Sequence, residues 1–269
     1  MIACGGLAVR SKYAGLKAML ARYGEVAVAF SGGVDSSFLL HAACFALGPA
    51  RVHALHARTP LLAGEESERV RATAQALGCP LTILEVDPFS WPIFVANPPD
   101  RCYHCKRKLY RSFLQARDSS RLPLLDGTNL DDLQEVRPGL AALAELGVLI
   151  PLAAAGLTKR EIRLLSRELG LATWNACSAS CLATRIPAGE PISLEKIFLV
   201  ARCEALLTAL GFAGVRVRLS GQEATVAVLR PDLERIVKND VISVIREGFA
   251  RLGAGRVRID PQGRPPVPA

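Results

Sequence analysis

The feature that most constrains this sequence is a glycine-rich loop between an apolar run and a helical segment. Residues 31–36 read Ser-Gly-Gly-Val-Asp-Ser. The apolar run Glu25–Phe30 before them is typical of a buried parallel strand, and Ser37–Leu47 after them has helical length and periodicity. Glycines let backbone N–H groups approach an anion, and the helix directs the positive end of its dipole at it. The pattern therefore predicts a phosphate-binding loop.

This loop differs from the P-loop of nucleoside triphosphatases, because the Gly-Lys-Ser/Thr ending is missing. No lysine lies within it, and Asp35 is better suited to hold Mg²⁺, directly or through water. The alternative, that the two glycines only form a tight turn, is disfavoured by the strand–loop–helix context. The residues predicted to bind phosphate are Ser31, Gly32, Gly33, Asp35, Ser36 and Ser37.

Strand-like and helix-like segments alternate after the loop, which predicts an α/β fold with a doubly wound parallel sheet. Ligands of such sheets bind beyond the carboxyl ends of the strands, where the loop lies. The predicted strands are 25–30, 52–57, 81–86 and 122–126; the predicted helices are 37–47, 65–77, 105–116, 140–146 and 158–169, the last with a capping-box spacing from Thr158 to Glu161.

The pattern changes near Pro187, where a smaller α+β domain is predicted to begin. We therefore expect a first domain over 1–187 and a second over 188–260. The tail 261–269 contains four prolines and is expected to be disordered. In the second domain the predicted helices are 194–210, 232–237 and 241–252, and the predicted strands are 215–219, 224–229 and 257–260.

The formal net charge of +8 favours polyanionic partners such as nucleotides, tRNA or phosphorylated small molecules, although a merely basic surface explains it equally well. No stretch reaches the roughly 18 apolar residues of a membrane-spanning helix, and the N-terminus lacks the pattern of a secretory signal. We therefore expect a cytoplasmic protein without a membrane partner.

The eight cysteines fall into isolated and grouped positions. In a reducing compartment they are not expected to form disulfides. The grouping suggests thiol chemistry or metal binding. Cys4, Cys44 and Cys79 stand alone, whereas the grouped ones are Cys102 with Cys105, Cys177 with Cys181, and Cys203.

The loop resembles that of the PP-loop ATP pyrophosphatases (the adenine nucleotide alpha hydrolase-like fold), which cut ATP between the α- and β-phosphates and leave an adenylated substrate. Further strings occur in order along the chain, and with the loop they resemble the LarE family of sulfur transferases from about residue 20 to 235. These strings are Arg-Cys-Tyr-His-Cys-Lys at 101–106, Asp-Gly-Thr-Asn-Leu-Asp-Asp at 126–132, Gly-Leu-Thr-Lys-Arg-Glu-Ile-Arg at 156–163 and Cys-Leu-Ala-Thr-Arg-Ile-Pro at 181–187.

This resemblance implies a reaction. The family uses ATP and Mg²⁺ to adenylate a carboxylate of pyridinium-3,5-biscarboxylic acid mononucleotide, releasing pyrophosphate, and converts that carboxylate to a thiocarboxylate. The product serves the biosynthesis of the nickel-pincer cofactor of lactate racemase. The implied partners are the pyridinium mononucleotide and a sulfur source; a nucleic acid is not expected, and a homo-oligomer is consistent with the family.

The resemblance offers two sources of sulfur. Cys181 matches a sacrificial cysteine, whose thioester loses its Cβ–S bond and leaves dehydroalanine. Cys177, Cys181 and Cys203 together resemble a three-cysteine type that holds a [4Fe-4S] cluster, and we favour this version. The remaining alternatives are three cysteines brought together by accident, with only Cys181 reactive, and a zinc site formed by Cys102 and Cys105 with Cys177 and Cys181.

The second domain also carries candidate substrate residues. Arg216 and Arg218 alternate along a predicted strand, so both point to one face and can grip a phosphate or carboxylate. They match the family's substrate site, although a solvated basic face remains an alternative. Glu204 and Asp232 match acidic positions of the family. Asp131 and Asp132 are candidates to assist Mg²⁺, although the Asp-Gly-Thr-Asn string before them is also typical of a turn and helix cap.

Three rival functions use parts of the same pattern. A tRNA-thiolating enzyme shares the ATP chemistry and the cysteines, but no RNA-binding module is evident. An ammonia- or glutamine-dependent amide synthetase shares the loop but needs no cysteine triplet. A nucleotide-sensing protein would bind ATP without releasing pyrophosphate.

Overall fold

The computed structural model describes residues 2–61, 65–117, 122–135, 137–176 and 180–265. The chain divides into two compact units: Met1–Thr59, Gly64–Val86 and Asp100–Ala176 form the first, and Pro60–Ala63, Asp87–Pro99 and Cys177–Ala269 form the second. The second unit thus begins before Pro187 and includes a segment from the middle of the chain. The Asn97 side chain holds this segment in place by donating to the carbonyls of Pro187 at 2.7 Å and Glu190 at 2.8 Å.

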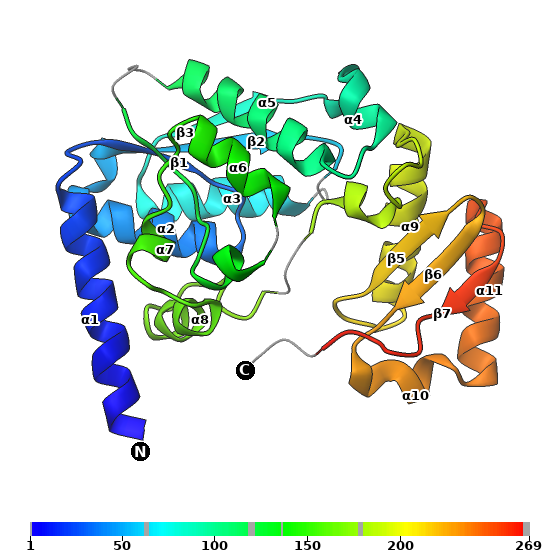
Figure 1. Cartoon of the computed structure of the whole chain (residues 1–269). Helices are drawn as coiled ribbons and strands as arrows, with labels where there is room; N and C mark the ends of the chain where they lie inside the picture. The colour runs from blue at the N-terminus through cyan, green and yellow to red at the C-terminus, as the bar shows by residue number, and fades with distance from the viewer. Residues whose placement is uncertain (1, 62–64, 118–121, 136, 177–179, 266–269) are drawn as a thin grey trace. The chain divides into compact units, whose positions relative to one another are not determined.

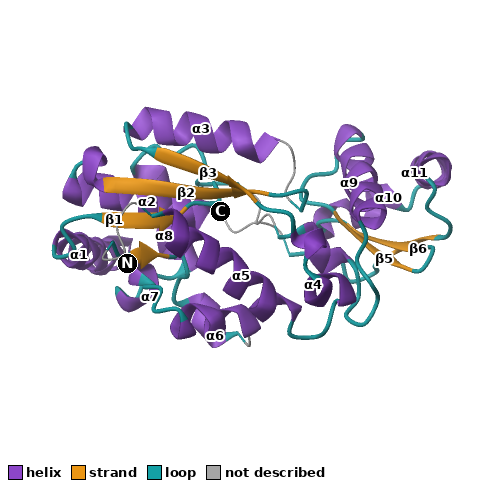
Figure 2. Cartoon of the chain, turned by 90° about the horizontal axis from the view of Figure 1, so that it is seen from above, coloured by secondary structure: helices purple, strands orange, loops and turns teal. Residues whose placement is uncertain are grey.

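The first unit is built on a four-stranded parallel sheet, which confirms the predicted fold class. Its order is β3-β2-β1-β4, so the chain adds strands on one side of β1 and then returns to the other (Figure 2). The strands are β1 Val26–Ala29, β2 Val52–Arg58, β3 Leu81–Glu85 and β4 Leu124–Leu125.

Helices cover both faces of this sheet (Figure 1). On one face of the sheet, the core contains Val26 and Val28 of β1 and Phe30, which follows β1. On the other face, the core contains Ala27 and Ala29. Because both faces are buried, the strands are continuous apolar runs, as expected for a parallel sheet. Helices α2 Val34–Leu47, α3 Glu65–Leu77 and α8 Lys159–Glu168 lie on one face, and α5 Arg101–Ala116 and α6 Pro138–Glu145 on the other.

The sequence patterns did not predict three helices: α1 Ile2–Ala21, α4 Pro92–Ala96 and α7 Pro151–Ala154. Helix α1 packs against α2, with Leu16 and Leu20 fully buried and the rings of Tyr13 and Phe38 centred 5.5 Å apart. Three glycines within α1 weaken its helical pattern, and its stability comes from this packing.

The second unit is α+β, as the sequence predicted. Its sheet has the order β5-β6-β7, with β5 and β6 antiparallel and β6 and β7 parallel. In the proline-rich tail, the Arg264 carbonyl accepts a backbone hydrogen bond from Arg230 and the Arg264 amide donates one to Val228. Residues 266–269 lie outside the described residues, and the disorder of the tail stays a prediction. The elements are α9 Leu194–Ala209, β5 Arg216–Ser220, β6 Glu223–Ala227, α10 Leu233–Ile236, α11 Asn239–Leu252 and β7 Val257–Ile259.

Candidate functional site

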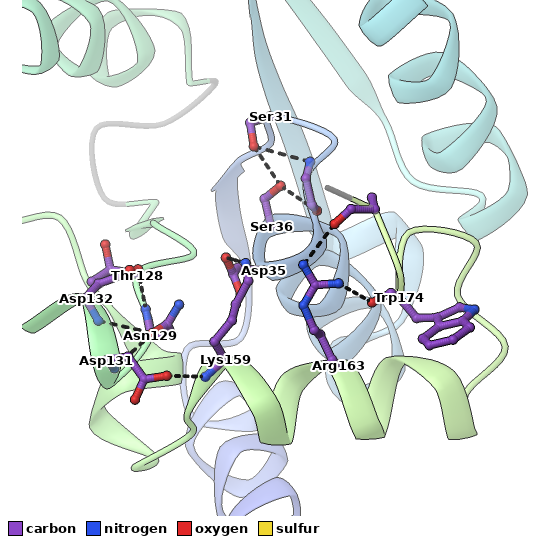
Figure 3. Close-up of polar contacts among 12 residues, drawn as sticks. Ser31, Asp35, Ser36, Thr128, Asn129, Asp131, Asp132, Lys159, Arg163 and Trp174 are labelled. Atoms are coloured by element: carbon purple, nitrogen blue, oxygen red, sulfur yellow. Dashed lines mark hydrogen bonds and ion pairs between the residues drawn. The ribbon is translucent and has the colours of Figure 1, made fainter. Parts of the chain in front are cut away.

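The predicted phosphate loop lies between the carboxyl end of β1 and helix α2. Gly32 has φ of +75°, and a Cβ there would come within 2.8 Å of Val70 Cγ2, so both conformation and space require glycine. The hydroxyls of Ser31 and Ser36 lie 3.0 Å apart, and the Ser36 hydroxyl donates to the Gly33 carbonyl at 3.3 Å. These contacts close the loop into a compact turn (Figure 3).

Helix α2 begins at Val34, three residues before the predicted start. Its N-cap is Gly33, which has no side chain to accept from the first-turn amides. Those amides and the positive end of the helix dipole therefore face the loop and can bind an anion. Ser36 and Ser37 belong to this first turn and are buried, as is much of the helix behind them.

The loop after β4 packs directly against this turn. A Cβ on Gly127 would lie 3.0 Å from the Ser36 amide nitrogen and 3.2 Å from the Asp35 carbonyl carbon. Glycine thus allows the backbones after β1 and β4 to approach each other. These strands lie where the order of the sheet reverses, which is where doubly wound sheets form ligand sites.

The ammonium of Lys159 donates to Asp35 Oδ2 and supplies the positive charge that the loop itself lacks (Figure 3). Lys159 is the first residue of α8, and its backbone amide donates to Asp131 Oδ2 at 2.8 Å. The predicted capping box between Thr158 and Glu161 is confirmed and fixes the start of this helix. The contact between Lys159 and Asp35 was not predicted, because sequence spacing gives no sign that α8 begins beside the loop.

Asp35 is the electrostatically strained group of the loop. Burial raises the pKa of its carboxyl, and the Lys159 ammonium opposes that shift. Its second oxygen, Oδ1, is buried and has no hydrogen-bond partner among the described residues. An unsatisfied carboxylate oxygen suits Mg²⁺, which takes one or two carboxylates together with phosphate oxygens. The residues therefore fit the predicted magnesium role of Asp35.

Asp126, at the end of β4, is held as a buried anion. It accepts from the hydroxyls of Tyr110 and Thr128 and from the Thr128 amide at 2.7 Å, and Lys106 Nζ lies 3.6 Å away. Burial would raise the pKa of Asp126, but the Lys106 charge and these hydrogen bonds outweigh it and lower the pKa. Lys106 comes from the predicted 101–106 string, which thus contributes a basic group close to the loops.

Asp131 and Asp132 open a short 3-10 turn, Asp131–Gln134, that Asn129 caps. Asn129 Oδ1 accepts from both of their amides, at 2.9 and 3.2 Å. The Asp132 carboxylate pairs with Arg137 at 2.8 Å, and that of Asp131 accepts from the Lys159 amide. These contacts favour the turn and its cap over a direct role of the two carboxylates in holding Mg²⁺.

The second unit gathers arginines around one carboxylate. Glu204 Oε1 accepts from Arg185 Nε at 2.6 Å and from the Val217 amide at 2.9 Å. Arg185 is only 5% exposed, so this is a buried ion pair. It joins helix α9 to the short turn that follows Cys181, and neither Arg185 nor this link was predicted.

Arg216 and Arg218 occupy alternate positions of β5 and so point to the same face, as predicted. Arg216 Nε is buried without a hydrogen-bond partner in the described ranges. Burial, together with the charges of Arg264 and Arg185, lowers the pKa of Arg216 to about 10. This region therefore carries excess positive charge that an anion would neutralise. Asp232 instead pairs with Arg235 at 3.8 Å.

The predicted cysteines are only partly located. Cys203 lies on α9 and is buried, which raises the pKa of its thiol to about 12. Cys181 is half-buried at the start of the turn Leu182–Arg185. Arg185 links the two segments, because it bonds Glu204 beside Cys203 and Ser180 Oγ beside Cys181, the latter at 2.7 Å.

Cys177 lies outside the described residues. Within those that are described, no three His, Cys, Asp or Glu side chains converge as a metal site. Cys102 is exposed and Cys105 is half-buried, both on α5 in the first unit. The roles of all these cysteines stay predictions.

The parallel sheet, the glycine loop at its switch point and the small second sheet define a PP-loop-like α/β protein of Rossmann type. No protein-family model matches the chain. Among curated proteins, it is 34% identical over 217 residues to the pyridinium-3,5-bisthiocarboxylic acid mononucleotide synthase of Lactiplantibacillus plantarum, covering 80% of this chain and 79% of that protein. The chain therefore belongs to the LarE family.

Two uncharacterised proteins are also similar. One, from Synechocystis sp., is 33% identical and the match covers 95% of each chain. The other, from Methanocaldococcus jannaschii, is 26% identical, with 85% of this chain and 88% of that protein covered. None of the helices in the described ranges combines the length and apolar character needed to span a membrane.

Proposed function

We propose that this protein is an ATP-dependent sulfurtransferase. It would adenylate a carboxylate of pyridinium-3,5-biscarboxylic acid mononucleotide and convert it to a thiocarboxylate for nickel-pincer cofactor biosynthesis. The observation that carries the proposal is the 34% identity to the L. plantarum pyridinium-3,5-bisthiocarboxylic acid mononucleotide synthase over most of both chains. The open helix N-terminus and the charged groups at the sheet's switch point support it.

In the first step the loop binds the triphosphate of ATP. The amides of the first turn of α2 donate hydrogen bonds to the phosphate oxygens, and Lys159 adds a full positive charge. Asp35 holds Mg²⁺ through its unpartnered oxygen. A substrate carboxylate oxygen attacks the α-phosphorus, the bond to the bridging oxygen breaks, and pyrophosphate leaves. The product is an acyl adenylate.

The substrate's phosphate is assigned to the second unit. Arg216 has a buried guanidinium nitrogen without a partner in the described part of the chain, and Arg218 lies on the same face of β5. A phosphate monoester accepts several charge-assisted hydrogen bonds from such a pair. Glu204 pairs with Arg185 and accepts from the Val217 amide, so it holds the strand that carries the two arginines and neutralises part of the positive charge.

The sulfur step is assigned to Cys177, Cys181 and Cys203 as ligands of a [4Fe-4S] cluster. The segments of Cys181 and Cys203 are tied together by Arg185, which fits two thiolates of one site. The buried Cys203 thiol is protonated at neutral pH and would release its proton on binding iron. When bound, such a cluster would supply sulfide held on an iron without a protein ligand, and the acyl adenylate that receives the sulfide would release AMP.

The competing route is sacrificial and uses Cys181 alone. Its thiolate attacks the acyl adenylate and AMP leaves, which gives a thioester. Removal of the Cα proton then breaks the Cβ–S bond, so the thiocarboxylate departs and dehydroalanine remains in the chain. The protein would lose the mass of H₂S, roughly 34 Da, in one turnover.

The deciding experiment is anaerobic purification with iron and sulfide analysis, followed by ATP, Mg²⁺ and the pyridinium dicarboxylate mononucleotide. We expect AMP, pyrophosphate and a thiocarboxylate product, about four irons per chain and no loss of protein mass. A mass loss of about 34 Da without iron would establish the sacrificial route instead. A third outcome is a protein that holds no iron, loses no mass and still turns over ATP and the mononucleotide after Cys181→Ala. That outcome would contradict sulfur transfer and favour an amide synthetase.

A further inference from the structure

Cys102 and Cys105 form a Cys-x-x-Cys pair at the start of helix α5, and no step of the proposed reaction uses them. Residues three apart in a helix lie on the same face, with Cα atoms about 5 Å apart. This separation is within the range that a disulfide spans. The first turn of a helix is also less constrained than its interior, because its amides have no intrahelical partners. The two thiols can therefore be joined and separated within one turn.

The two thiols differ in exposure, since Cys102 is exposed and Cys105 is half-buried. Cys102 also has a cationic neighbour: Arg101 Nη2 donates to Cys102 Sγ at 3.7 Å, and Arg101 is only 9% exposed. Accessible cysteines beside an arginine in the first turn of a helix are typical nucleophiles. Cys102 is therefore suited to attack first, and Cys105 to resolve the product.

The pair lies on a turn that faces the same edge of the sheet as the phosphate loop. Lys106, next to Cys105, has its Nζ 3.6 Å from Asp126 Oδ2 at the carboxyl end of β4. The Asp126 carboxylate also accepts from the Thr128 amide, in the loop that packs on the first turn of α2. Thiol chemistry on this turn would take place on the side of the unit where the substrate is activated.

We propose that Cys102 and Cys105 are a redox-active dithiol that takes sulfur from a persulfide donor and releases it as sulfide. The inference rests on the proposed function only for the use of the product, since the cluster route consumes sulfide. The disulfide that forms is transient and catalytic, so it does not conflict with a reducing compartment.

The reaction has two steps, and each thiol gives its proton to solvent before it attacks. First, Cys102 Sγ attacks the outer sulfur of the donor persulfide, the sulfur–sulfur bond of the donor breaks, and the donor leaves as a thiolate. Second, Cys105 Sγ attacks Cys102 Sγ, which forms the disulfide and expels hydrosulfide. The two cysteines together lose two electrons, which reduce the transferred sulfur to sulfide. A thiol reductant then restores the pair.

Anaerobic incubation of the reduced full-length protein with glutathione persulfide, without ATP, Mg²⁺ or the mononucleotide, tests these steps. We expect about one sulfide per chain above the untreated protein and a mass loss of about 2 Da, with the disulfide mapped to Cys102 and Cys105 by peptide mass analysis. Absence of sulfide, or a disulfide between other cysteines, would overturn the inference. So would a zinc ion that copurifies with the protein and is lost in Cys105→Ser, because the pair would then be a metal site.

Three variants separate the roles of the thiols. Cys105→Ser should stop after the first step, with a gain of about 32 Da on Cys102 and at least about tenfold less sulfide. Cys102→Ser should show neither the added sulfur nor the sulfide. Cys79→Ala, in the core of the same unit, is the control and should react as the wild type does.

Both serine variants should melt at the wild-type temperature, because the two positions are exposed or half-buried. Sulfide release at the wild-type rate in either serine variant would contradict the dithiol.

The failure of this inference and the failure of the proposed function are distinguishable. Sulfide release by a protein that forms no thiocarboxylate would refute the sulfurtransferase and support the dithiol. A thiocarboxylate product from a protein that releases no sulfide from glutathione persulfide would support the sulfurtransferase and overturn the dithiol.

Discussion

Lys159 and Asp35 form an ion pair across 124 positions of the sequence, and this pair joins the start of α8 to the phosphate loop. The loop contains a carboxylate but no cation, so the fold delivers the positive charge from a distant helix. The leaving pyrophosphate would compete with Asp35 for the Lys159 ammonium. Asp35 would then be free to hold Mg²⁺ with both oxygens.

Replacing Lys159 should therefore impair the adenylation step more than it impairs folding. Lys159→Met is expected to lower ATP-dependent pyrophosphate release by about 10²–10³-fold, because a preorganised charge at the leaving group is lost. Pyrophosphate release and the melting temperature should be measured on the same samples. Lys159→Arg keeps the charge and should recover part of the rate; equal losses in both variants would show that charge is not what matters.

Asp35 should be a site where function opposes stability. Its pKa is raised in the folded protein, so the folded state binds this proton more readily than the unfolded state. Stability from this group is present below the ordinary pKa of 3.8 and is lost as pH rises through the folded value. Asp35→Asn should thus be more stable than the wild type at pH 7, by roughly 0.5–2 kcal/mol, yet inactive.

The pH dependence of urea denaturation checks this sign. The difference between Asp35→Asn and the wild type should shrink as pH falls and vanish below about pH 4, where the carboxyl is protonated in both states. A destabilised Asp35→Asn at neutral pH would mean that the pair with Lys159 outweighs the cost of burial.

Gly127 should be essential for the contact between the two loops. In Gly127→Ala the new methyl group would meet the backbone of Ser36 at 3.0 Å, and backbone cannot turn aside as a side chain can. We expect the loops to separate and pyrophosphate release to fall by roughly 10²-fold, since small misplacements are costly in catalysis. Gly15→Ala is the control, because a Cβ there meets nothing within 4 Å. It should stabilise α1 by about 0.5–1 kcal/mol without changing activity.

The second unit should depend on the pair of Arg185 and Glu204. Glu204→Ala leaves a guanidinium that is 5% exposed without its carboxylate, and should lower the free energy of unfolding by about 3 kcal/mol or more. The matched control is Glu247→Ala, whose partner Arg251 is on the surface with a side chain 76% exposed. That change should lower the same free energy by less than about 1 kcal/mol. Similar losses in urea denaturation would show that the pair does not hold the unit together.

The cysteines should differ sharply in reactivity before metal is bound. Burial raises the pKa of Cys203 to about 12, so its thiolate is scarce near neutral pH, whereas Cys102 is exposed. N-ethylmaleimide should label Cys102 rapidly and Cys203 only after unfolding, as mapped by peptide mass analysis at pH 7. Rapid labelling of Cys203 in the folded protein would contradict its burial.

The sequence by itself determined the first sheet and the position of the phosphate loop. Continuous apolar runs mark strands buried on both faces, and glycines mark places where backbone must approach backbone or take a positive φ. These signals are local, so they are read directly from neighbouring residues. The same local logic gave the capping box of Thr158 and Glu161 and the common face of Arg216 and Arg218.

Only the tertiary structure decided which distant groups meet. The approach of Lys159 to Asp35, of Gly127 to Ser36 and of Arg185 to Glu204 depends on how helices pack on the sheets. No spacing along the chain encodes these contacts, because each contact joins two segments whose positions are set by the packing of other side chains. Packing also set the burial that shifts the pKa values of Asp35 and Cys203, which no sequence pattern reports.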